Sequence, residues 1–225
     1  MIRIPRRGAP ADLENNQRRW TGRWRENGPS SDWATPRAKT ILREALAAIT
    51  HGKCAYCERN PGTLEIDHYV AKSVDSDSAF VWENLFPACH ECNFRKGDVD
   101  HVGRLLKPDE DDPEAFFWLG PEGELKPRPE CTPPDEQRAL KTIEILGLQR
   151  PGLRQNREFL MHVVALALPQ RSELLLAPER EHKFVIRQTL VRLGRPDLAE
   201  QDRRRFEGTP VEGRTRRNRR GQSRR

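Results

Sequence analysis

Two closely spaced cysteine pairs restrict the folds open to this chain more than any other feature of its sequence. The first pair is Cys54 and Cys57, the second is Cys89 and Cys92, and two residues separate the cysteines of each pair. One such pair places two thiolates on a tight turn, and two pairs complete the tetrahedral four-cysteine site of a structural zinc ion. The intervening segment, residues 58–88, is longer than the linker of a common zinc ribbon, so we expect it to contain structure of its own. A redox role for either pair is the alternative interpretation, but neither lies in an evident βαβ pattern.

The rest of the sequence favours metal over disulfide bonds as the partner of these cysteines. No apolar run follows the charged first residues, and the longest apolar stretch, residues 163–168, is far shorter than the roughly 18 residues of a membrane span. We therefore expect a cytoplasmic protein without a membrane partner, in a compartment where thiols stay reduced. We interpret Cys131, the fifth cysteine, as a small buried or free residue, and His51 and His90 as bystanders near the pairs.

Charge is distributed unevenly along the chain. In total, 40 Lys and Arg against 34 Asp and Glu give a net charge of +6. Residues 203–225 contain ten arginines and two acids, whereas residues 50–98, around the cysteine pairs, contain eight acids and five bases. An acidic centre between basic ends fits a cation site flanked by arms that hold a polyanion such as nucleic acid. The alternative is a solvated tail without a specific partner.

Polar residues with catalytic chemistry lie between the cysteine pairs and directly after the second. Apolar and acidic residues alternate up to Asp67 and His68, which predicts a strand end that presents these two side chains together. An isolated Asp-His pair is usually only a surface turn. Here its significance comes from order, because Asn84 precedes the second cysteine pair and Asn93 directly follows it.

This order of a cysteine pair, Asp-His, Asn-Leu, a second cysteine pair and Asn-x-x-Lys resembles the HNH endonucleases over residues 50–98. The resemblance implies a ββα-metal hairpin in which His68 is the general base and Asn84 holds the loop and orients that base. It also implies that Asp67 and Asn93 bind the catalytic metal. We further predict that Arg95 and Lys96 contact nucleic acid.

The residue types suit phosphodiester hydrolysis. An imidazole with a pKa near 6.5 accepts a proton from water at neutral pH. A carboxylate and an amide oxygen suit a hard catalytic ion, Mg²⁺ or Mn²⁺, whereas the four thiolates suit Zn²⁺. The chain departs from the family at two positions. Asn93 stands where many relatives have His and is a weaker ligand, and Ala71 stands where relatives often have Pro.

A narrower resemblance extends beyond the hairpin. Residues 82–89, 105–114 and 142–149 are similar to the PtuB family, the HNH nuclease subunits of Septu and retron-associated anti-phage systems, and the similarity covers most of residues 40–200. It implies a role in phage defence and an ATPase partner of the PtuA kind. As the nucleic acid partner we favour DNA over RNA.

Helical spacing of apolar residues predicts helices over residues 36–49, 135–146, 153–168 and 182–193. We therefore expect an α+β protein, with a zinc-stapled ββα-metal hairpin embedded in a mainly helical chain with extended arms. Four regions are predicted: a basic extended N-terminal arm (1–40), an HNH nuclease core with the four-cysteine zinc site (41–105), a Pro- and acid-rich connector with a helical C-terminal region (106–202), and a disordered Arg-rich tail (203–225).

The function predicted from these features is metal-dependent endonucleolytic cleavage of nucleic acid, in a defence system coupled to an ATPase. The alternative is a non-catalytic subunit, either a zinc-ribbon module that binds nucleic acid or a scaffold that docks through the C-terminal helices. The complete set of four polar residues, Asp67, His68, Asn84 and Asn93, favours catalysis.

Overall fold

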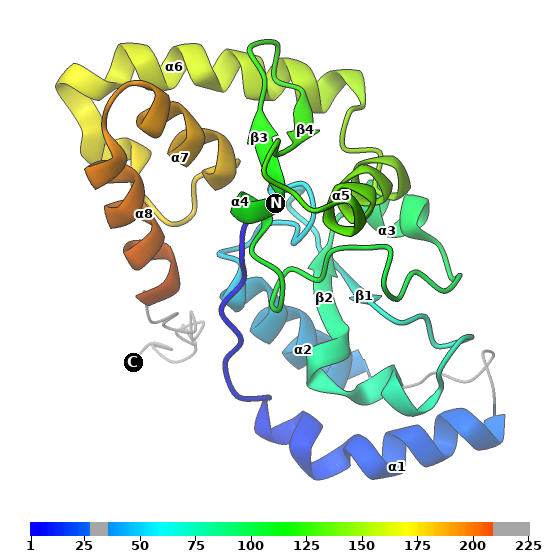
Figure 1. Ribbon diagram of the computed structural model, residues 1–225. Helices are drawn as coiled ribbons and strands as arrows, with labels where there is room; N and C mark the ends of the chain where they lie inside the picture. The colour runs from blue at the N-terminus through cyan, green and yellow to red at the C-terminus, as the bar shows by residue number, and fades with distance from the viewer. Residues whose placement is uncertain (28–35, 209–225) are drawn as a thin grey trace, which may run out of the picture.

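The computed structural model describes residues 1–27 and 36–208, which form a mainly helical protein around two small sheets (Figure 1). In chain order the elements are α1 (Ala11–Asn27), α2 (Pro36–Ile49), β1 (Glu65–His68), the 3₁₀ turns η2 (Asp77–Phe80) and η3 (Trp82–Asn84), β2 (Leu85–Ala88), α3 (His90–Lys96), α4 (Pro113–Phe116), β3 (Phe117–Leu119), β4 (Leu125–Pro127), α5 (Pro133–Ile145), α6 (Pro151–Leu175), α7 (Lys183–Arg192) and α8 (Pro196–Gly208).

A short antiparallel hairpin followed by a helix forms the centre of the molecule. Strands β1 and β2 pair with Glu65 opposite Ala88 and His68 opposite Leu85. Helix α3 begins directly after β2, and the Cys89 thiol caps it by accepting a hydrogen bond from the Cys92 amide. The second cysteine pair therefore straddles the start of this helix. The predicted α+β class and ββα hairpin are confirmed.

The hairpin packs against α2, which has the bounds predicted from the sequence. Leu42, Leu46 and Ile49 recur at helical spacing and are buried against the two strands. All four residues of β2 are buried, so this strand lies inside the molecule rather than at its surface. The core that forms there fixes the orientation of β1, the strand that carries Asp67 and His68.

The prediction of an extended N-terminal arm over residues 1–40 is wrong for most of its length. Residues 11–27 form α1, because Leu13, Trp20 and Trp24 recur on one helical face and become buried. Trp20 meets Phe80 of η2 edge to face, with ring centroids 5.9 Å apart. The preceding residues are not a solvated arm either, since Arg6 forms a partly buried ion pair with Asp109 at 2.8 Å. Residues 28–35 lie outside the described part.

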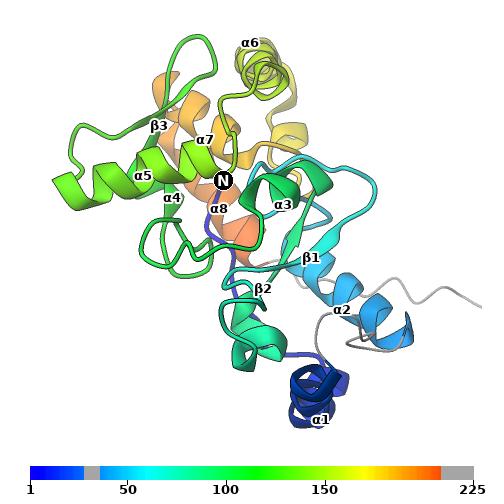
Figure 2. The same cartoon turned by 90° about the vertical axis from the view of Figure 1, so that its right-hand side faces the viewer.

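Helices α5 to α8 cover the other side of the molecule, and α6 and α1 lie at opposite ends in both views (Figures 1 and 2). Helix α5 starts earlier than predicted, because Thr132 rather than Asp135 is its N-cap. Helix α6 does not stop at Pro169 but continues to Leu175 through a kink at Arg171. No helix among residues 1–27 and 36–208 has both the length and the apolar character needed to cross a membrane.

A buried charge network joins α4, α7 and α8. The Asp202 carboxylate pairs with Lys183 and with Arg187, and Arg187 also reaches Glu114 at 2.8 Å. Arg203 pairs with Glu114 at the edge of this network. The predicted disordered tail therefore begins too early: residues 203–208 belong to α8 because their partners are supplied by distant segments. The remainder of that tail, residues 209–225, lies outside the described residues.

Candidate active site and zinc site

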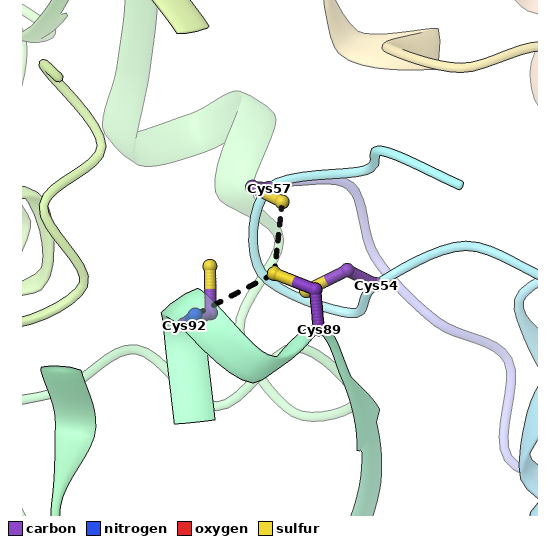
Figure 3. A group of neighbouring side chains, drawn as sticks. All are labelled: Cys54, Cys57, Cys89 and Cys92. Carbon is purple, nitrogen blue, oxygen red and sulfur yellow. Dashed lines mark hydrogen bonds between the residues drawn. The ribbon is translucent and has the colours of Figure 1, made fainter. Parts of the chain in front are cut away.

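The four paired cysteines converge on a single point between the turn at residues 54–57 and the start of α3 (Figure 3). Their sulfur atoms all lie within 4.8 Å of one another, and all four residues are buried. The Cys57 and Cys89 sulfurs are 3.7 Å apart. Two sulfurs at about 2.3 Å from one tetrahedral ion would be separated by about 3.8 Å. The cluster thus has the dimensions of a closed zinc site.

The electrostatics of this cluster call for a cation. Burial raises the pKa of Cys54 well above its ordinary value, whereas hydrogen bonds from the other thiols lower the pKa of Cys89. Four thiolates this close cannot all be charged in a buried site without a positive ion between them. Within the described residues, no other group of three or more Cys, His, Asp or Glu has this arrangement.

The helical region contributes an outer layer to the cysteine cluster. Arg150, in the turn before α6, donates to the Cys92 sulfur at 3.6 Å and to the Leu146 carbonyl at 3.1 Å. Its positive charge opposes the negative charge of a zinc-thiolate centre and ties that centre to the end of α5. His51 and His90 are not members of the cluster, as expected from the sequence.

A cavity of about 590 Å³ lies beside the cysteine cluster, on the β1–α3 side of the hairpin. It is lined by residues from β1, from the loop that follows it, and from α3: Glu65, Ile66, Asp67, His68, Ala71, Lys72, His90, Asn93, Phe94, Lys96, Gly97 and Asp98. Three of the four predicted catalytic residues therefore line one cavity: Asp67, His68 and Asn93. The fourth, Asn84, is buried and does not line it.

His68 ends β1 and is held in one ring orientation. Its Nε2 lies 2.9 Å from the Ala79 carbonyl, which only accepts, so Nε2 carries the proton and Nδ1 is the basic atom of the neutral ring. Burial, followed by the charges of Lys72 and Lys96, lowers the pKa of His68 to about 3. The imidazole is therefore neutral at physiological pH and can accept a proton.

Asn84 ties together the loop between His68 and Ala79. Its Oδ1 accepts from the Val70 amide at 2.7 Å, and its Nδ2 donates to the Val70 and Ser78 carbonyls at 3.0 Å each. Asn84 thus pins both sides of the loop that supplies the hydrogen bond to His68. This is the geometry of a residue that holds the loop rather than one that touches a substrate.

The Asp67 side chain is buried in the wall of the cavity rather than exposed to solvent. It is 3% exposed, its Oδ1 lies 3.0 Å from the Lys96 ammonium, and its Oδ2 accepts a hydrogen bond from Tyr56. These contacts hold the carboxylate in one orientation next to His68. Each oxygen has a second lone pair, so both contacts are compatible with a metal ligand.

Glu65 is a site residue that the sequence analysis missed. Its Oε2 accepts from the Asn93 side-chain amide at 2.6 Å, and its Oε1 lies 2.9 Å from His90 Nδ1. The first contact directs the Asn93 nitrogen toward Glu65 and leaves the amide oxygen as the atom available to a cation. Glu65 lies two residues before Asp67, so strand alternation places both on the same face of β1, a signal present in the sequence.

Lys96 and Arg95, which we predicted to contact nucleic acid, both have acidic partners. Lys96 is 2% exposed, and its ammonium is occupied by Asp67 and by the His68 carbonyl at 2.6 Å. Arg95 is exposed but pairs with Glu91 at 2.5 Å and is not part of the cavity lining. A second lysine that lines the cavity is Lys72, whose ammonium also lies 4.6 Å from the Trp24 ring centroid.

Comparisons with known proteins agree with this geometry. Residues 54–99 match the HNH endonuclease family model. The Septu protein PtuB of Bacillus thuringiensis is 28% identical over 124 residues, which cover 53% of this chain and 46% of PtuB. A Vibrio cholerae serotype O1 biovar El Tor protein, named as an HNH endonuclease of retron Vc95, is 23% identical over 149 residues, 60% of this chain and 73% of that protein.

The matched segment coincides with the structural unit described above. The family match begins at Cys54, the first cysteine of the cluster, and ends just beyond α3. The chain spans about half the length of PtuB, so the similarity to that protein covers only part of it. Residues 54–99 therefore form a unit that matches the HNH endonuclease family model and lies within a mainly helical chain.

Proposed function

We propose that this protein is a metal-dependent endonuclease that hydrolyses phosphodiester bonds in nucleic acid, with DNA as the favoured substrate. The observation that carries the proposal is the placement of His68, Asp67 and Asn93 around one cavity of an HNH domain. A non-catalytic zinc-ribbon module would not need a neutral, oriented imidazole beside a carboxylate and an amide oxygen. The alternative of a purely binding or scaffold subunit is therefore less well supported.

In the proposed mechanism His68 Nδ1 takes the proton from the attacking water. The Ala79 carbonyl holds the opposite ring nitrogen, and Asn84 holds the loop that carries this carbonyl. The low pKa of His68 keeps the ring in its proton-accepting form before substrate arrives. A phosphodiester in the cavity adds negative charge beside the ring and raises its proton affinity, which strengthens the base when it is needed.

Oxygen donors at the cavity suit a hard divalent cation, Mg²⁺ or Mn²⁺. Asp67 supplies a carboxylate and Asn93 an amide oxygen, with Glu65 fixing the orientation of that amide. When bound, the ion would neutralise charge that develops on the phosphate and the leaving oxygen. The four cysteines are proposed to hold a separate structural Zn²⁺, because soft thiolates and hard oxygens select different metals.

Dependence on the oxygen-bound metal is the direct test of this function. Purified protein should nick or linearise plasmid DNA with Mg²⁺ or Mn²⁺, and cleavage should stop after the weakly held ion is chelated and resume when Mg²⁺ is restored. Zinc content, measured by elemental analysis before and after this cycle, should not change. Binding of plasmid without metal-dependent cleavage would contradict the proposal and favour the non-catalytic module.

We further propose that the protein works in the cytoplasm as the nuclease subunit of an anti-phage defence system with a PtuA-like ATPase partner. The partial sequence similarity to Septu PtuB and to a retron-associated HNH protein supports this assignment. Co-purification of the chain with an ATPase encoded beside it would test the partnership.

A further inference from the structure

Two exposed aromatic rings stand at the mouth of the cavity. Phe94 is 76% exposed, and the side chain of His90, one helical turn earlier on α3, is 80% exposed. Their rings are nearly parallel, at 27°, with centroids 6.1 Å apart. Both residues line the cavity that contains His68, and Phe94 directly follows Asn93. We call this pair the aromatic platform.

His90, one ring of the aromatic platform, is held in place relative to Asn93. His90 Nδ1 lies 2.9 Å from Glu65 Oε1, and the other oxygen of Glu65 accepts from Asn93. Helix α3 itself lies beside β1 at the surface of the molecule (Figure 2). The same carboxylate therefore orients one ring of the platform and the amide at the cavity wall. A lone exposed phenylalanine is common on protein surfaces, but two neighbouring exposed rings at a polar cavity, one of them held by Glu65, are not accounted for by packing.

We propose that the aromatic platform stacks against an unpaired nucleobase next to the phosphate to be cleaved; this inference rests on the proposed nuclease function. A base presents a flat π face to an aromatic ring only when it is unpaired and unstacked, because in a duplex its neighbours cover that face. Phe94 adjoins Asn93 in the chain, so the stacked base belongs to a nucleotide at the cavity. Lys72, which lines the same cavity from the loop after β1, supplies positive charge for the backbone. The platform thus selects single-stranded or locally opened nucleic acid.

The test compares Phe94→Ala with Phe94→Trp and with Phe159→Ala. Phe159 is 71% exposed on α6 and is not part of this cavity, so it is a matched control for loss of an exposed phenylalanine. All variants carry His68→Ala as well, which prevents cleavage during the measurement. Fluorescence anisotropy with Mg²⁺ gives the affinity for labelled single-stranded DNA, single-stranded RNA of the same sequence, and duplex DNA.

We expect Phe94→Ala to weaken binding of the single strand by about 5- to 150-fold, the usual effect of one lost base-stacking contact. Duplex binding should change by less than about twofold on this stacking argument. Phe94→Trp should retain the affinity for single strands. Phe159→Ala should have the same affinity as the protein that carries His68→Ala alone. A loss on DNA alone or on RNA alone would support the platform and identify its nucleic acid. The thermal midpoint of every variant should equal that of the protein with His68→Ala alone, because the side chains at positions 94 and 159 are exposed.

An unchanged single-strand affinity for Phe94→Ala would overturn the inference, as would an equal loss on single strand and duplex. Both outcomes are distinguishable from failure of the proposed function. If the unmutated protein cleaves plasmid but Phe94→Ala binds single strands normally, the nuclease stands and the platform falls. If the binding pattern appears but no metal-dependent cleavage is found, the platform stands as a binding site and the nuclease assignment falls.

Discussion

His68→Ala should reduce nucleic acid cleavage by about 100-fold or more, the scale expected for the loss of a general base. The neutral ring presents Nδ1 as its basic atom, and alanine leaves nothing in this position to take the proton from water. Single-turnover cleavage of plasmid with saturating Mg²⁺ measures this effect on chemistry rather than on binding. Affinity for nucleic acid and zinc content should remain close to those of the unmutated protein.

Folding must be separated from chemistry in this experiment. Alanine also leaves the Ala79 carbonyl without its buried donor, which costs about 1–3 kcal/mol of stability. His68→Gln places an amide donor near the position of the imidazole Nε2 without a basic nitrogen, so it should be as inactive as the alanine variant but more stable. His162→Ala, which removes an exposed histidine on α6, should be fully active. Full activity of His68→Ala would mean that another group activates the water, and the mechanism would be wrong.

The pH profile of the same reaction adds a signature of His68. An ordinary histidine with a pKa near 6.5 would lose activity as a base when the pH falls below that value. Burial and the nearby lysine charges lower the pKa of His68 to about 3, so protonation of the free protein sets in only at much lower pH. We therefore expect kcat/KM to show no acid limb near pH 6.5, since this parameter reports the free enzyme.

Cys89→Ser should unfold the centre of the protein rather than merely inactivate it. Structural zinc sites of this type contribute on the order of 10 kcal/mol to small metal-stabilised units. The hairpin has two strands of four residues each, too few to hold α3 in position without the metal. Serine can still cap α3 by accepting from the Cys92 amide, so the expected loss comes from the missing metal ligand. Solubility, thermal midpoint and cleavage should all fall.

Cys131→Ser is the matched control for this substitution. Cys131 is a free, partly exposed cysteine and is not a member of the four-sulfur cluster. The control should keep about one zinc per chain, as the closed four-thiolate site requires, together with the thermal midpoint of the unmutated protein. Elemental analysis of active protein that finds no zinc would refute the structural role of the metal, whatever the effect of Cys89→Ser on activity.

Local sequence alone was enough to predict the four-cysteine cluster and the hairpin. Two residues between paired cysteines bring the sulfurs together through a tight turn, and this geometry hardly depends on distant parts of the chain. The same holds for the ββα order, because α3 starts at the second cysteine pair and β1 ends at Asp67 and His68. The presence of Asp67, His68 and Asn93 at one cavity followed from that local order.

Only tertiary packing decided which charged side chains face the cavity. Lys96 and Arg95 are neighbours with the same kind of charge, yet one is buried against Asp67 and the other pairs with Glu91 at the surface. A helix presents adjacent residues about 100° apart, so the packing of α3 on β1 determines which one turns inward. The sequence shows that Arg95 and Lys96 are both present, but it does not show in which direction either side chain points.

At the two ends of the chain, too, tertiary packing rather than local sequence decided the structure. We expected a basic extended arm over residues 1–40, but Trp20 and Trp24 are buried in the core and lie on one face of α1. From the sequence we expected Arg203 to begin a disordered basic tail. In the structure Arg203 belongs to α8 and pairs with Glu114 of α4, which is distant in the sequence. Short-range geometry therefore specified the four-cysteine centre, whereas burial and ion pairing between distant segments specified the parts that surround it. The free energies of burial and ion pairing between these segments arise only when the segments are in contact, so the local sequence does not reveal them.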